Sequence, residues 1–92
     1  MAETSAGFVA ECFWVGVKAE DLRVLDLRVE ACIAEMTRGG EIIRYLGSML
    51  MGEDEVVMCF FEGSADNVRR AAEAARIPFE RIIETTRSHG VA

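Results

Sequence analysis

The sequence predicts one α+β domain in which four strands form a single sheet and two helices pack on it. The chain has 92 residues, enough for one hydrophobic core. Its residues are 51% hydrophobic and 28% charged, with one proline and eight glycines, which excludes disordered and collagen-like chains. The spacing of apolar residues alternates between strand-like and helix-like in the order β-α-β-β-α-β.

The first two elements are a buried strand and a long amphipathic helix. Residues 8–15 are aromatic and β-branched and lie between two glycines, which predicts a central strand. In residues 20–38 apolar side chains recur every three or four positions, and two glycines follow as a helix stop. Val24 and Leu27 lie on the opposite side of this helix and predict either a second contact or ordinary exposed aliphatic residues.

The next elements are a hairpin and a short helix. Residues 41–51 and 55–62 are apolar runs joined by a turn with glycine and acidic residues, which indicates a β-hairpin. Ser64 is expected to cap a helix over residues 65–76, whose inner stripe of small residues allows close packing on a sheet.

The last strand completes the predicted fold. Pro78 ends the second helix, and residues 79–85 are expected to form a strand. Residues 87–92 are polar and are expected to be a flexible tail, so the ordered core of the single domain (residues 1–92) covers about residues 7–86. Right-handed crossovers then predict a ferredoxin-like antiparallel sheet, strand order 4-1-3-2, with both helices on one face.

Both faces of this sheet are expected to be apolar. Along the first strand, Phe8, Ala10 and Cys12 are expected on one face. The apolar residues Val9 and Phe13 are expected on the other. Because two helices cover only one face, the helix-free face needs a partner sheet or a small apolar ligand. A homodimer that closes sheet against sheet is the simplest solution, since most soluble oligomers have two-fold symmetry.

Charge and cysteine content limit the partners and the compartment. The net charge of −6 argues against nucleic acid and anionic membranes as partners, because both require clustered basic residues. Three widely spaced cysteines do not form the framework of a secreted disulfide-rich protein. The start of the chain lacks a basic segment and a long apolar run, so we expect neither a signal peptide nor a membrane helix and predict a cytoplasmic protein.

Four residues are candidates for ligand binding. Glu11 is the one charged residue within the first strand, and a buried carboxylate needs a cation or a hydrogen-bond donor. Arg44 and Tyr45 in the second strand are candidate partners, and Phe13 is expected to lie in the apolar surface around them. Glu11 then acts either as a polar anchor or general acid/base in a pocket, or as half of a structural ion pair.

Candidate metal ligands are also present. Cys12 and Cys59 lie on strands predicted to be neighbours, and two thiols on one face predict either a soft-metal or redox pair or two small core residues. His89 is the only histidine and lies near the end of the chain. Together with Glu11, these residues form the candidate metal set.

Six segments of the chain are considered together: Phe8–Phe13, Val17–Leu22, Ile43–Ser48, Glu53–Glu55, Phe61–Val68 and Ala75–Ile82. They resemble a family of small bacterial proteins of unknown function that includes a nickel-responsive, nickel-binding protein of actinobacteria. The resemblance covers residues 7–86. It implies a ferredoxin-like fold assembled as a dimer, and nickel as a cofactor held by histidines on and just after the first strand. The matching stretch, residues 11–16, contains no histidine, which leaves Glu11 and Cys12 as the candidate ligands there.

Three functional hypotheses follow. The first is a non-enzymatic homodimer that binds a small apolar or amphipathic ligand, or a protein partner, in the space around the sheet face. The second is a metal-binding protein, with nickel implied by the resemblance. The third is a cofactor-free enzyme of the dimeric α/β-barrel kind, such as a polyketide cyclase or monooxygenase, with Glu11, Arg44 and Tyr45 in its pocket.

Overall fold

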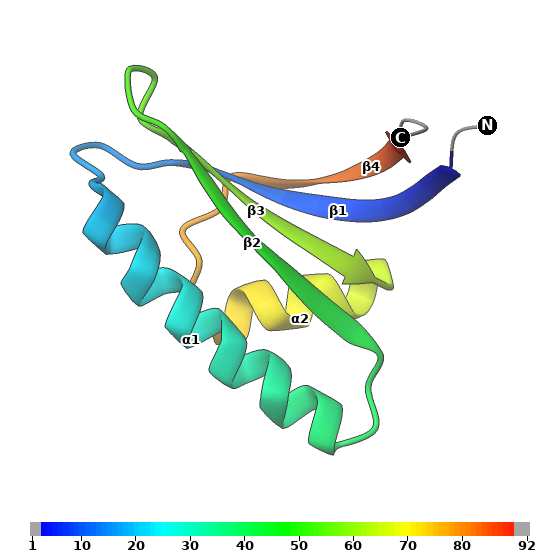
Figure 1. The fold of residues 1–92 in the computed structure, drawn as a ribbon. Coiled ribbons are helices and arrows are strands. Elements are labelled where there is room, and N and C mark those ends of the chain that lie inside the picture. Colours follow the sequence, from blue (N-terminus) through cyan, green and yellow to red (C-terminus); the bar gives the residue numbers. More distant parts are fainter. Residues whose placement is uncertain (1–2, 90–92) are drawn as a thin grey trace.

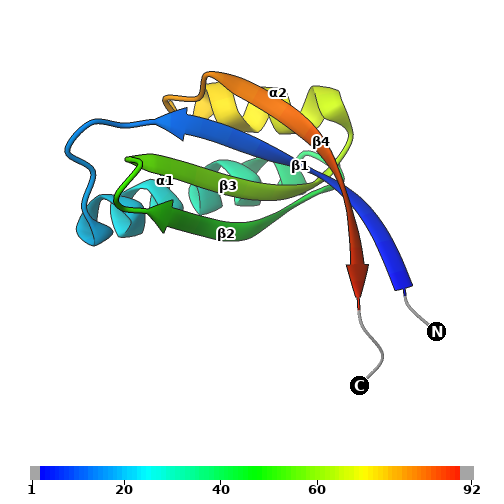
Figure 2. The ribbon, with the colours of Figure 1, turned by 90° about the horizontal axis from the view of Figure 1, so that it is seen from above.

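The computed structural model describes residues 3–89, with side chains from residue 7 to residue 88. It is an α+β fold in which two helices cover one face of a four-stranded antiparallel sheet (Figures 1 and 2). The strand order β2-β3-β1-β4 confirms the predicted order 4-1-3-2, read from the opposite edge. The elements are β1 (Glu3–Phe13), α1 (Ala19–Arg38), β2 (Ile43–Met51), β3 (Val56–Gly63), α2 (Ala65–Ala74) and β4 (Arg81–His89).

Helix α1 begins and ends close to its predicted limits. The backbone N–H of Lys18 donates to Asp21 Oδ2 at 2.8 Å, and acidic residues in the first turn favour the positive end of the helix dipole. Leu25 and Val29 form its fully buried stripe. No helix among the described residues is long and apolar enough to cross a membrane.

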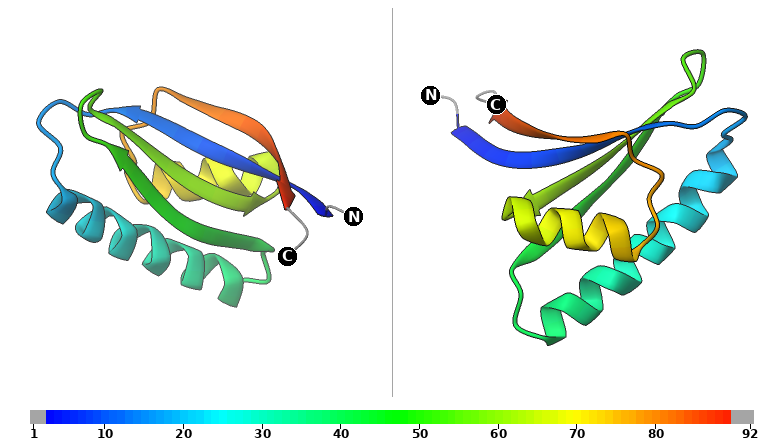
Figure 3. Two further views of the ribbon diagram at one scale, coloured as in Figure 1. Left: turned by 45° about the horizontal axis from the view of Figure 1, so that its top comes forward. Right: turned by 180° about the vertical axis from the view of Figure 1, so that it is seen from behind.

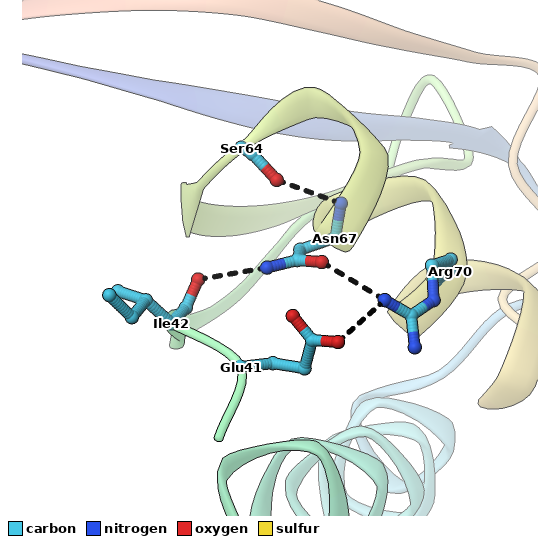
Figure 4. Close-up of polar contacts among 5 residues, drawn as sticks. All are labelled: Glu41, Ile42, Ser64, Asn67 and Arg70. Carbon is cyan, nitrogen blue, oxygen red and sulfur yellow. Dashed lines mark hydrogen bonds and ion pairs between the residues drawn. The ribbon is translucent and has the colours of Figure 1, made fainter. Parts of the chain in front are cut away.

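Helix α2 begins at the predicted cap and is tied to the segment that leads into β2. Ser64 Oγ accepts a hydrogen bond from the backbone N–H of Asn67 at 3.1 Å. The Asn67 side chain donates to the carbonyl of Ile42, and Arg70 pairs with Glu41 at 3.0 Å (Figure 4). These contacts fix the start of β2 against the second helix.

β1 and β4 are longer than predicted at the end of the molecule where β1 begins and β4 ends. β1 begins at Glu3 and β4 continues to His89, and residues 3–7 pair with residues 85–89 as a two-stranded arm. The arm extends beyond the last pair of β1 with β3, Phe8 with Phe61 (Figure 3). Its residues are mostly polar and show no apolar alternation, so the sequence indicated a tail where the backbone forms a ladder.

The core lies between the sheet and the helices. Alternate residues of β1 and β3 point into it and meet the apolar stripes of both helices, where small alanines on α2 allow a close approach. The residues of this core with almost no exposed surface include Ala10, Cys12, Leu25, Val29, Val57, Cys59, Phe61, Val68, Ala71 and Ala72.

Candidate functional site

The sheet face opposite the helices is covered by no described helix and carries exposed apolar side chains, although Val9 and Val56 on it are buried among their neighbours. We call it the helix-free face. Two of its side chains, Phe13 and Met49, are 57% and 53% exposed. A run directly across the strands holds Met49, Met58, Glu11 and Arg81, as the pairing register shows. The face comprises Val9, Glu11, Phe13, Arg44, Leu46, Met49, Met51, Val56, Met58, Phe60, Glu62, Arg81 and Ile83.

The helix-free face is also curved. The β2–β3 hairpin turn at one end and the ends of β1 and β4 at the other both project to the side away from the helices (Figure 1). The sequence predicted an apolar second face, and the structure shows one. Its curvature follows from strand twist, which a one-dimensional pattern does not report.

Glu11 is the one charged residue among the buried side chains described, and it lies on the helix-free face at 9% exposure. Its partner is Arg81, whose Nε donates to Glu11 Oε1 at 2.7 Å. The hydrogen bond and the charge of Glu11 raise the pKa of Arg81, so this guanidinium is cationic at every physiological pH. The carboxylate inside the apolar face is therefore paired.

Arg81 was absent from the sequence-based candidates. It lies 70 positions from Glu11, and only the pairing of β1 with β4 brings the two together. The predicted strand order already placed the last strand beside the first, so a basic residue at the start of the last strand was the signal that could have found it. Which residues face each other depends on register, which the apolar pattern did not specify.

The structure does not bring Glu11, Arg44 and Tyr45 together. Arg44 lies on the helix-free face, where its Nη1 pairs with Glu62 Oε1 at 3.0 Å. Tyr45 is the next residue along β2, so its side chain points to the opposite face, toward the helices. Phe13 shares a face with Glu11, two positions along β1.

Tyr45 belongs to a polar cluster between α1 and β2. Its hydroxyl donates to Asp26 Oδ1 at 2.5 Å, and Ser48 Oγ donates to the same oxygen at 2.8 Å. Burial and the hydrogen bond to Asp26 raise the pKa of Tyr45. Neither Asp26 nor Ser48 was a sequence candidate, and an acidic residue on an amphipathic helix, such as Asp26 on α1, normally indicates a solvated surface.

The sheet separates Glu11 from the two candidate thiol ligands, Cys12 and Cys59. Cys12 and Cys59 are free, buried thiols on the helix side, where Cys59 is opposite Ala10 and therefore diagonal to Cys12. Glu11 points to the other side, since consecutive strand residues alternate. The hydrogen bond to Cys59 and burial raise the pKa of Cys12, which favours the protonated thiol over the metal-binding thiolate.

The fourth candidate metal ligand, His89, has a side chain outside the described part of the structure. Within the described part, no group of three or more histidine, cysteine, aspartate or glutamate side chains is placed to hold a metal ion.

A shallow hollow lies where the arm leaves the helix-free face. Its volume is about 10 Å³, room for about one water molecule. Leu46 and Phe60 form apolar walls, and Glu62, Thr85 and Arg87 contribute polar groups. A β-bulge between Tyr45 and Gly47 places Leu46 at this position. The hollow extends the apolar surface toward the arm.

Comparisons with protein-family models, with curated proteins and with solved structures found no match to this chain. The resemblance to the nickel-binding family therefore stays a prediction. The residues themselves supply an extensive apolar sheet face, with the Arg81 guanidinium held by Glu11 at its β4 edge.

Proposed function

We propose that this chain is a ferredoxin-like domain that acts as a non-enzymatic homodimer, with the helix-free faces of two copies against each other and a small apolar ligand between them. The observation that carries the proposal is the uncovered apolar face, with Phe13 and Met49 more than half exposed. Burying a Phe or Met side chain is worth about 1.5–3 kcal/mol, so several such residues favour closure by a second surface.

The composition of the face supports a binding role. Met49, Met51 and Met58 lie together on neighbouring positions of β2 and β3, and flexible thioether side chains adapt to ligands of irregular shape. The projecting ends of the sheet leave the middle of the face recessed, which favours a space between two copies (Figure 1).

The same geometry favours binding over catalysis. The three residues that an acid–base mechanism would use are divided between two faces of the sheet, and the Glu11 carboxylate already accepts from Arg81. A general base must reach a proton within hydrogen-bond distance, and no second titratable partner lies beside Glu11 on this face apart from Arg81.

Light scattering coupled to size-exclusion chromatography tests the dimer. We expect the wild type to have the mass of two chains and Phe13→Asp or Met49→Asp to have the mass of one, with circular dichroism confirming that the variants are folded. The matched control is Leu27→Asp, an equally exposed apolar residue on the outer side of α1, at 67% exposure. It should remain dimeric.

Two results contradict the proposed interface. A monomeric wild type at micromolar concentration refutes the homodimer. A dimer that survives both face substitutions but is lost in Leu27→Asp places the interface on α1 instead. Saturable binding of Nile red, a neutral apolar dye, by the wild-type dimer tests the ligand role separately.

A further inference from the structure

We infer that Arg81 anchors the anionic group of a small amphipathic ligand whose apolar body lies on the helix-free face. The inference rests on the proposed function and names the class of ligand: one singly charged carboxylate or sulfonate group on an apolar chain or ring. The observations that carry it are the geometry of the Glu11–Arg81 pair and the residues beside it.

The guanidinium of Arg81 is oriented but only partly used. Its Nε donates to Glu11, whereas its two Nη groups make no hydrogen bond to any residue that the structure describes. The side chain is 67% exposed, so these donors point to the solvent side of the face. A guanidinium held in place offers a planar set of donors that matches a carboxylate.

A structural ion pair alone accounts for this arrangement less well. If a second copy closes over the face, the Nη groups of Arg81 lose their water and become unsatisfied donors unless an acceptor arrives with the closure. Burying an ion pair is costly, so an interface with only a structural role would be as stable with apolar residues in place of Glu11 and Arg81. An anionic ligand group supplies the missing acceptor.

The surface next to Arg81 fits an apolar body. Ile83 follows Arg81 on the same side of β4, and the register places Val9 and then Phe60 beside it across the sheet. Val9 is only 6% exposed, so the half-buried Ile83 and Phe60 supply the contact surface. This apolar row leads to the hollow that Phe60 and Leu46 line. The carboxylate of Glu11 lies beside Arg81 and repels a dianionic phosphate more strongly than a singly charged group, so a singly charged ligand is favoured.

Binding of two probes tests the inference. Dodecanoate is titrated by calorimetry, below its micelle concentration, and Nile red is titrated by fluorescence. We expect Arg81→Gln to weaken dodecanoate binding at least about tenfold, the usual effect of losing a hydrogen-bonded charge, and to leave Nile red binding unchanged. Arg81→Lys keeps the charge without the planar donors and should recover only part of the affinity.

The matched control is Arg70→Gln. Arg70 is an arginine in an ion pair of the same length, 3.0 Å to Glu41, but it lies on α2 on the other side of the sheet, and its replacement should change neither affinity. The inference is overturned if Arg81→Gln weakens the binding of both probes equally or leaves dodecanoate binding unchanged. In either case, Nile red binding by the wild type still supports the proposed function.

Two further results distinguish the possible failures. If the wild-type dimer binds neither probe, the inference and the ligand role fail together while the dimer itself stands. Sedimentation with phosphatidylglycerol vesicles that depends on Arg81 identifies a membrane lipid surface as the anion source and overturns the assignment to a free small molecule.

Discussion

The side chains of neighbouring residues on one strand lie on opposite faces of the sheet and have different partners. Glu11 faces the open side and pairs with Arg81, whereas Cys12 beside it is fully buried against the helices. Arg44 and Tyr45 are divided in the same way. Successive side chains on a strand alternate between faces, so a shift of one residue in strand register would move each side chain to the other face and give it different partners.

The Tyr45 hydroxyl should make stability sensitive to alkaline pH. Tyr45 is the only tyrosine, and its pKa is raised in the folded protein. Below about pH 10 both states hold the phenol proton, whereas above it the unfolded chain loses the proton first. The free energy of unfolding should therefore decrease with rising pH there, by up to about 1.4 kcal/mol per pH unit from this group.

Urea unfolding of Tyr45→Phe measures this contribution. At about pH 8 the variant should be less stable than the wild type by about 1 kcal/mol, the value of one net hydrogen bond. The difference should shrink as the pH approaches about 11, since only the wild type loses the tyrosine contribution. A difference that stays constant with pH would mean that Tyr45 ionises equally easily in both states.

Among the elements, the two-stranded arm and the hairpin turn shape the helix-free face from its two ends. Gly7 lies where β1 leaves β3, and a Cβ at this position would be 2.6 Å from the carbonyl oxygen of Phe61. The close approach of two backbones here requires the absence of a side chain. The sequence offered Gly7 only as a strand boundary, whereas it lies inside β1.

Gly7→Ala should destabilise the protein by about 1–3 kcal/mol, because the added methyl group forces the two strands apart. The matched control is Gly52→Ala in the hairpin turn, where a Cβ would have no neighbour within 4 Å and the change should be within about 0.5 kcal/mol of neutral. Thermal unfolding by circular dichroism compares the two. Equal stability of both variants would show that β1 and β3 are further apart than the contact implies.

The whole molecule has one covered and one open sheet face, and this asymmetry predicts concentration-dependent stability. If the folded protein is a dimer, a tenfold rise in protein concentration should add about 1.4 kcal/mol to the free energy of unfolding and raise the melting temperature. Differential scanning calorimetry at two concentrations measures the shift. The melting temperature of Phe13→Asp should not change with concentration, and an invariant wild type would contradict the dimer.

The fold followed closely from the apolar pattern. The 3.6-residue period of α1, the Ser64 cap of α2 and the glycine-containing hairpin turn are local signals, and each formed as expected. The apolar pattern did not predict the two-stranded arm, because its residues are mostly polar and are joined by backbone pairing. The candidate site was found in part: Glu11 and Phe13 share the helix-free face, whereas Tyr45 does not.

The sequence by itself determined the element order, the sheet topology and the excess of apolar residues over what two helices can cover. These properties depend on local periodicity and composition, which a linear chain carries completely. Only the tertiary structure decided that Glu11 pairs with Arg81, that Tyr45 bonds to Asp26, and that the open face is curved. Such features depend on register and twist, which are settled when distant strands pair and the helices pack on one side.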